Sequence, residues 1–132
     1  MTASSKLVDN ISSFNEFVDD YIASNSLGKI NRVLKIKKYI DLHYHLPIKI
    51  ESLSKQLNVS KYYFIKTFRR YVGITPLQYL KSVRFQKSKE LLKKGFTPRE
   101  ACFAVGFSSV PSFYNGFKKR YALTPNQYIQ QN

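Results

Sequence analysis

The chain is poor in cysteine and acidic residues and has no long apolar run, and each shortage excludes a class of protein. Cys102 is the one cysteine among 132 residues, so the chain can form neither an internal disulfide nor a thiolate metal cluster. No apolar stretch approaches the roughly 20 residues of a membrane-spanning helix, and the N-terminus lacks the basic start and apolar core of a signal peptide. We therefore expect a soluble cytoplasmic protein with no membrane partner.

Charge of one sign dominates the composition. Only 8 Asp and Glu stand against 22 Lys and Arg, which gives a formal net charge of +14. Residues 1–28 hold one lysine and four acidic residues, a net charge of −3, so residues 29–132 carry +17. Such a field favours a polyanion, because each Lys or Arg that neutralises a phosphate releases a condensed counterion. A basic surface also keeps proteins soluble, so charge alone leaves both interpretations open.

No residue pattern typical of an enzyme or a metal site stands out. The chain shows no paired carboxylates in a plausible cleft, no Ser/His/Asp set, no phosphate-binding glycine loop and no metal-ligand spacing. His43 and His45 are expected on a helix surface rather than at a metal, and Cys102 in the core rather than as a nucleophile. We expect no enzyme activity, no metal and no cofactor.

The strongest positive signal is an internal repeat. The pattern F-x3-F-x6-T-P-x-Q-Y begins at Phe64 and recurs at Phe113, a shift of 49 residues. A turn precedes each copy, and Asn58 in the first turn and Gly106 in the second suit the left-handed corner of a helix-turn-helix. One extra residue separates the turn from the phenylalanine in the second copy. In a basic chain, the repeat predicts two DNA-reading heads on one polypeptide.

Apolar residues recur at spacings of three and four, which predicts an all-α fold. An amphipathic helix is expected over about residues 5–23, followed by a break at 24–28. A second helix ends before Pro47, and a short third helix covers about residues 50–57.

Three later helix starts share the sequence T-P-x-Q or T-P-x-E, at Thr75, Thr97 and Thr124. In each, the threonine hydroxyl can accept from a free backbone N–H, the proline needs no partner, and the Gln or Glu reaches back to the cap. A long connector helix should follow Thr75 and link the two units. The expected organisation is an acidic helix and linker at 1–28 and a DNA-binding domain at 29–132, with helix-turn-helix units at about 50–71 and 97–121 and the connector at about 76–94.

The order and spacing of these residues match a known family. The matching residues are Ser60-x3-Phe64-x3-Phe68, Gly73-Ile74-Thr75-Pro76-x2-Tyr79-Leu80, Arg84, Leu91-Leu92, Val105-Gly106-Phe107-Ser108 and Phe113-x3-Phe117-Lys118-x-Arg120-Tyr121-x2-Thr124-Pro125-x2-Tyr128. Across about residues 30–130 the chain resembles the DNA-binding domain of the AraC/XylS transcription regulators. The resemblance implies two helix-turn-helix subdomains bridged by a long helix, with recognition helices in successive major grooves. It also implies an activator that contacts RNA polymerase.

The first recognition helix, about residues 60–71, carries the best base-reading candidates. Phe64 and Phe68 should point into the core, which leaves the opposite face to DNA. Lysine can donate to guanine, and aromatic or aliphatic side chains can pack on thymine methyl groups. The candidates are Lys61, Tyr62, Ile65 and Lys66. The alternative is that Lys66 is merely solvated and Tyr62 merely packed.

The second recognition helix, about residues 109–121, departs from the family. Val110 and Pro111 replace polar or basic residues, and Gly116 lies in mid-helix at a cost of roughly 1 kcal/mol relative to alanine. Ser112 and Asn115 remain as candidate base contacts, with Asn115 the more plausible reader. We therefore expect the first head to supply most of the sequence discrimination.

Phosphate contacts are expected from basic side chains beside the recognition helices and from capped helix N-termini, whose free amides favour anions. The candidates are Arg69, Arg70, Thr75, Thr97, Lys118 and Lys119. The alternative for each cation is a solvated side chain that does not touch DNA. Arg84 is expected to be structural and to pair with an acidic side chain across the subdomains.

The acidic N-terminal segment carries a heptad-like apolar seam at Leu7, Ile11, Phe14, Val18 and Tyr21. It could pack on its own domain, associate with a second copy or a partner, or be a linker helix from a missing sensor domain. The sequence thus predicts a sequence-specific binder of double-stranded DNA that regulates transcription, either alone or as the output part of a longer protein. The alternative is a protein-interaction module of the same fold that binds another regulator or RNA polymerase.

Overall fold

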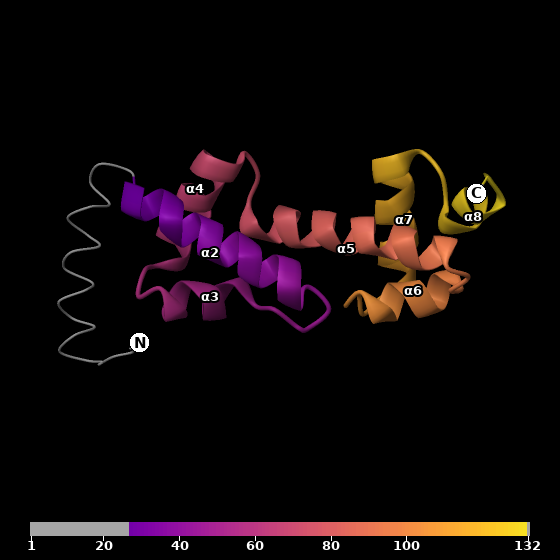
Figure 1. The fold of residues 1–132 in the computed structure, drawn as a ribbon, viewed down its shortest axis with the longest axis horizontal. Helices are drawn as coiled ribbons and strands as arrows, with labels where there is room; N and C mark the ends of the chain where they lie inside the picture. The colour runs from indigo at the N-terminus through magenta and orange to yellow at the C-terminus, as the bar shows by residue number, and fades with distance from the viewer. Residues whose placement is uncertain (1–26, 132) are drawn as a thin grey trace.

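The computed structural model describes residues 27–131, which form α-helices joined by short turns and contain no strand within that range. The helices are α2 (Leu27–His43), α3 (Ile50–Gln56), α4 (Lys61–Val72), α5 (Pro76–Lys93), α6 (Pro98–Ala104), α7 (Val110–Tyr121) and α8 (Pro125–Gln131) (Figure 1). The all-α prediction is confirmed. None of these helices is both long and apolar enough to cross a membrane.

The N-terminal boundary differs from the expected one. The amphipathic helix predicted over residues 5–23 lies outside the described residues. The break predicted at 24–28 is wrong at its last two positions, because α2 already begins at Leu27. Gly28 is buried in the first turn of α2, and such tertiary packing overrides the weak helix propensity of glycine.

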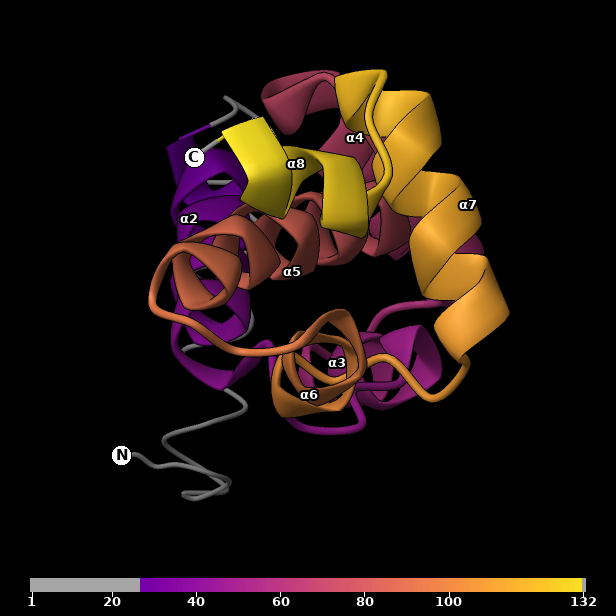
Figure 2. The ribbon, with the colours of Figure 1, turned by 90° about the vertical axis from the view of Figure 1, so that its right-hand side faces the viewer.

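The two helix-turn-helix units are arranged along one long helix. Helices α3 and α4 form the first unit, α6 and α7 form the second, and α5 runs between them along the long axis of the molecule (Figure 1). In the view down this axis, α3 and α6 overlap, and α4 and α7 lie on one side of α5 (Figure 2). The second unit is therefore close to a translated copy of the first.

The first unit has its own hydrophobic core. Phe64 and Phe68 of α4 are buried, as the spacing predicted, and the Phe68 ring lies 5.9 Å from the ring of Tyr79 on α5. The other buried members of this core are Val33, Ile36, Ile40, Leu53 and Leu80. Full burial of one such side chain contributes about 1.5–3 kcal/mol, so these contacts fix how α4 sits on α2 and α5.

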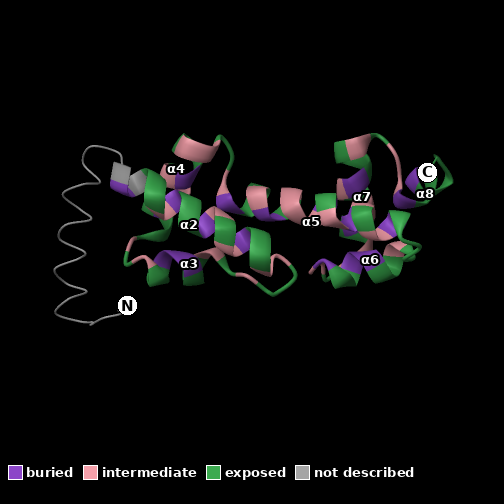
Figure 3. Ribbon diagram, viewed as in Figure 1, coloured by how far each residue is buried: buried purple, intermediate pink, exposed green. Residues whose placement is uncertain are grey.

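The second unit has a separate core that uses the other half of α5. Phe85 of α5 stacks against Phe113 of α7, with ring centroids 5.9 Å apart, and Phe117 is also fully buried. Figure 3 shows buried stretches of α5 beside both units. One helix thus contributes to two cores that do not merge.

Gly116 is explained by this second core. A Cβ atom at Gly116 would lie 2.5 Å from Cζ of Phe85, closer than real Cβ contacts come. Glycine in the middle of α7 lowers helix propensity, but it allows the Phe85 ring to lie directly against the helix backbone. The mid-helix glycine is therefore a packing requirement.

The caps and corners have the predicted chemistry. Thr75, Thr97 and Thr124 each accept from the backbone N–H three residues on, and the Gln or Glu at that position accepts from the threonine N–H. Both turns have a left-handed corner, with φ of 60° at Asn58 and 106° at Gly106. The extra residue of the second copy lies in the turn, which covers 105–109 against 57–60 in the first.

Small residues let the helices of each unit cross closely. Ser54 and Cys102 occupy matching places on α3 and α6, and both are buried. Burial raises the pKa of the Cys102 thiol, because the desolvated thiolate is disfavoured. Cys102 is therefore the core residue that the sequence predicted.

A polar contact joins α2 to α5 in the first unit. The Tyr79 hydroxyl donates to the Asp41 carboxylate at 2.6 Å, and burial together with this bond raises the pKa of Tyr79 from 10.0 to about 12. Above pH 10 the unfolded chain loses this proton first, so the stability that Tyr79 contributes falls as the pH rises from 10 to 12.

We predict that Tyr79→Phe lowers the free energy of unfolding by about 1 kcal/mol at pH 7, because the hydrogen bond is lost. The gap between the wild type and the variant should narrow as the pH rises above 10. Urea denaturation of both proteins at pH 7, 9, 10.5 and 11.5 measures this. A gap that stays constant across the series would contradict the assigned pKa.

Ala122 occupies the position that matches Gly73, and it adopts a left-handed conformation with φ of 63°. Because a Cβ atom disfavours this region, we predict that Ala122→Gly raises the free energy of unfolding by about 1 kcal/mol. Gly73→Ala, at φ of 96° with no atom near the new Cβ, is the reciprocal control and should destabilise. Urea denaturation that shows equal or reversed effects would refute the backbone argument.

Candidate nucleic-acid interface

The two recognition helices begin with the same cap and expose equivalent faces. Ser60 accepts from the Tyr63 N–H at the start of α4, and Ser109 accepts from the Ser112 N–H at the start of α7. Both helices bury their phenylalanine pair and end in a basic turn. The first turns of both helices are thereby held rigid, with their outer side chains in solvent.

The first head carries a compact reading surface on α4. Tyr62 is the most exposed large apolar side chain of the described residues, at 75% of its full accessibility. The Lys66 ammonium lies 6.0 Å from the centre of the Tyr62 ring, one helical turn away, and Ile65 is half-buried beside them. This surface combines a cation, a flat ring and an aliphatic group, which suit guanine and thymine edges.

Lys61 already has an acidic partner on α3. Its ammonium lies 3.4 Å from a carboxylate oxygen of Glu51 on α3, and both side chains are well exposed. An exposed pair of this kind contributes roughly 0–1 kcal/mol, so a phosphate or base can compete for the lysine. Binding through Lys61 requires this exchange, whereas Lys66 lies over the Tyr62 ring and forms no ion pair with an acid among the described residues.

A groove brings together candidates that the sequence considered separately. Lys61 and Ile65 of α4 line it together with Thr75 at the start of α5. Lys49, which the sequence analysis missed, lies exposed on its rim directly before α3. The signal available for Lys49 was its place just before the first helix of the helix-turn-helix, where helix N-termini approach phosphates.

The second head offers fewer long polar groups. Pro111, Ser112 and Asn115 are exposed on α7, and Tyr114 is half-buried with its ring nearly perpendicular to that of Phe113. Of the three exposed residues, Asn115 has the longest hydrogen-bonding side chain. The first head exposes a cation and an aromatic ring at Lys66 and Tyr62, whereas the second exposes only a proline and short polar side chains at the matching face.

The basic candidates lie at the C-terminal ends of the recognition helices. Arg69 and Arg70 occupy the last turn of α4, and Lys118 and Lys119 that of α7, all exposed. In these places they also complement the negative end of the helix dipole. Their positions serve helix stability and phosphate binding alike.

The two capped N-termini differ in charge. At Thr75 the backbone N–H donates to the neutral amide oxygen of Gln78 at 2.9 Å. At Thr97 it donates to the Glu100 carboxylate at 2.8 Å. A carboxylate already placed at the helix start repels a second anion, so Thr75 is the better phosphate position of the two.

Arg84 pairs with no acid in residues 27–131, so that expectation is wrong for the part of the chain that the structure describes. Its Nε donates to the Tyr44 carbonyl at 2.7 Å, and its Nη2 donates to the Leu46 carbonyl at 2.9 Å. Burial lowers the pKa of Arg84, and the two carbonyls beyond the end of α2 compensate the buried charge. Every residue has a backbone carbonyl that can accept a hydrogen bond, so the sequence contains no pattern from which these two partners of Arg84 could be predicted.

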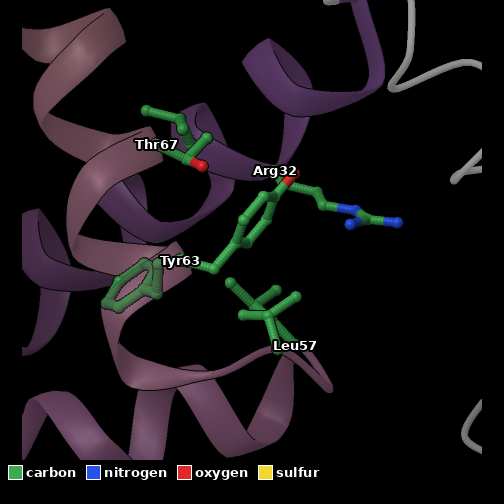
Figure 4. Close-up of a pocket in the computed structure, with 7 residues that line it drawn as sticks. Arg32, Leu57, Tyr63 and Thr67 are labelled. Carbon is green, nitrogen blue, oxygen red and sulfur yellow. The ribbon is translucent and has the colours of Figure 1, made fainter.

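A small pocket lies between α2 and α4 (Figure 4). Arg32, Leu57, Tyr63 and Thr67 line it, and its volume of about 20 Å³ has room for about one water molecule. It is too small for an effector molecule, and it does not include the exposed ring of Tyr62.

Comparisons with known proteins agree with this geometry. Residues 53–131 match the model of a family described as a helix-turn-helix domain. The chain is 32% identical to the transcriptional regulatory protein HptR of Staphylococcus aureus over 113 residues. The matched region covers 86% of this chain and 41% of HptR. The chain therefore spans less than half the length of that curated relative.

Solved structures share the fold. The C-terminal domain of the two-component response regulator yesN from Fusobacterium nucleatum is 33% identical, with a TM-score of 0.71 over 75% of this chain and 98% of that one. A probable AraC family transcriptional regulator from Rhodopseudomonas palustris is 28% identical, with a TM-score of 0.70 over 76% and 96%. The chain thus belongs to the AraC family of helix-turn-helix transcription regulators and carries the DNA-binding domain of that family.

Proposed function

We propose that the chain reads one asymmetric DNA site with α4 and α7 in successive major grooves on one face of the duplex. The observation that carries this proposal is the placement of both recognition helices on one side of α5. At 1.5 Å per residue, the 18 residues of α5 span about 27 Å. This length is of the order of the 34 Å that separates equivalent groove positions one helical turn apart.

In this proposal the first head supplies most of the discrimination. Lys66 donates to guanine, and Tyr62 and Ile65 pack on thymine methyl groups. Lys61 and Thr75 hold the flanking phosphates from the two sides of their shared groove, together with Lys49. The expected base and phosphate contacts of this head therefore lie within one continuous surface.

The second head binds mainly through the backbone of the DNA. Lys118 and Lys119 contact phosphates, while Asn115, assisted by Ser112, is its one base reader. This head adds affinity that depends strongly on salt and adds less sequence preference. Arg69 and Arg70 make the equivalent phosphate contacts at the first head.

The regulatory role follows the family. We propose an activator that contacts RNA polymerase in the cytoplasm. Because HptR is more than twice as long as this chain, these residues could serve as the output part of a longer regulator. The N-terminal segment, with its apolar seam at Leu7, Ile11, Phe14, Val18 and Tyr21, would then dock onto a partner or a second copy.

One observation favours the alternative of a protein-interaction module. The first turn of α7 exposes Pro111 and Ser112 rather than a basic side chain. A head without readers can bind a protein surface instead of DNA. The +17 charge of residues 29–132 and the cationic face of α4 oppose this alternative.

We predict that Lys66→Ala relaxes the preference at one base pair by about 1–3 kcal/mol, because a single donor to the base edge is lost. Asn115→Ala should relax the preference less. Binding to duplexes enriched from a random pool, measured by fluorescence anisotropy across salt concentrations, tests both. Lys38→Ala, which removes an exposed lysine of α2, is the matched control and should leave sequence preference unchanged.

Two results would count against the proposal. If Asn115→Ala relaxes specificity as much as Lys66→Ala, the asymmetry of the two heads is wrong. If the wild type selects no motif and Lys66→Ala barely changes its affinity, the protein-interaction alternative replaces DNA reading.

A further inference from the structure

We propose that Arg84 and Gly106 form a clamp between the two heads, which fixes their mutual orientation and so determines the half-site spacing that the protein accepts. The part of this inference that concerns spacing rests on the proposed function. The clamp itself is a property of the free protein and can be tested without DNA.

Arg84 lies near the middle of α5 and reaches back to the first head. Its guanidinium holds the Tyr44 and Leu46 carbonyls at 2.7 and 2.9 Å. Tyr44 directly follows the last residue of α2, where the carbonyl groups of the helix end carry partial negative charge. Two hydrogen bonds from one planar group fix direction as well as distance.

The same side chain also touches the second head. The Arg84 guanidinium lies 5.8 Å from the centre of the Phe107 ring. Phe107 belongs to the second core, with its ring 4.8 Å from that of Phe85 and 5.4 Å from that of Phe113 on α7. Arg84 therefore connects the end of α2 to the residues that seat the second recognition helix.

Gly106 completes the junction from the second head. A Cβ atom there would lie 2.9 Å from Arg84 Nε and 2.9 Å from the Tyr44 carbonyl oxygen. The matching corner of the first head is Asn58, whose φ of 60° is also left-handed. Gly106 lies further into the region that favours glycine, at φ of 106°, and the close approach of the two heads adds a second requirement because it leaves no room for a Cβ atom.

The clamp affects DNA binding because a change in the spacing between half-sites rotates one half-site around the duplex axis relative to the other. Inserting one base pair between half-sites turns the second by about 35° around the duplex axis. Heads joined only by a helix could follow part of this rotation through bending of α5. Heads held at Arg84 and Gly106 cannot, so the protein should discriminate strongly against a changed spacing.

The first test measures the orientation of the heads in free protein. Nitroxide labels are placed at Lys55→Cys on α3 and Asn126→Cys on α8, both exposed, in a Cys102→Ser background that copies Ser54 of the first head. Double electron–electron resonance should give one narrow distance distribution. Arg84→Lys, which keeps the charge but loses the planar fork, should broaden it; an unchanged narrow distribution would overturn the clamp.

A glycine pair controls for backbone strain. Gly106→Ala should broaden the distribution, since its Cβ atom meets Arg84 and Tyr44. Gly95→Ala has nearly the same φ, 99° against 106°, but no atom within 4 Å of the new Cβ, and it should leave the distribution narrow. If both variants broaden the distance distribution equally, backbone strain explains the broadening, and the proposed contact of Gly106 with Arg84 and Tyr44 is wrong.

The second test compares the selected duplex with one lengthened by a base pair between half-sites. The wild type should bind the longer duplex about tenfold more weakly, the order of one mismatched base pair. Arg84→Lys should reduce this ratio to about threefold or less. An unchanged ratio in Arg84→Lys would overturn the role of the clamp in spacing, whereas a wild type without spacing preference would count against the proposed function.

Discussion

The structure depends on one helix that must satisfy two hydrophobic cores. Helix α5 gives Leu80 to the core of the first unit and Phe85 to that of the second. Each unit alone is a small set of short helices, and such units bury too little surface to be stable without support. Because α5 is continuous, the packing of the phenylalanines of α4 and α7 against it also determines where the two recognition helices point.

The functional surface is what remains exposed after these cores have formed. Once Phe64 and Phe68 are buried, the helical repeat directs Tyr62 and Lys66 into solvent. The same logic on α7 exposes Asn115, but there Gly116 is taken up by the approach of Phe85. The second recognition helix therefore has no side chain at position 116, where the Phe85 ring packs. This is consistent with a head that reads DNA less selectively.

Much of this fold could be predicted from the sequence because its signals are local. The threonine capping boxes, the left-handed corners and the phenylalanine pairs each depend on residues within a turn or two. The partner of Arg84 could not be predicted, since backbone carbonyls 38 and 40 residues away leave no sequence pattern. The same holds for Gly116, which follows from the approach of Phe85, and for the buried Gly28 at the start of α2. The site residues on α4 and α7 were predicted as exposed positions, and their contacts with DNA stay predictions.

The central claim is that one continuous helix presents two heads to one face of the duplex. Hydroxyl-radical footprinting of the protein on its selected site tests this claim most directly. The account predicts two protected stretches on one face, separated by about one helical turn of roughly 10 base pairs, with the intervening outer face cleaved. A single protected stretch, or protection on opposite faces, would contradict it.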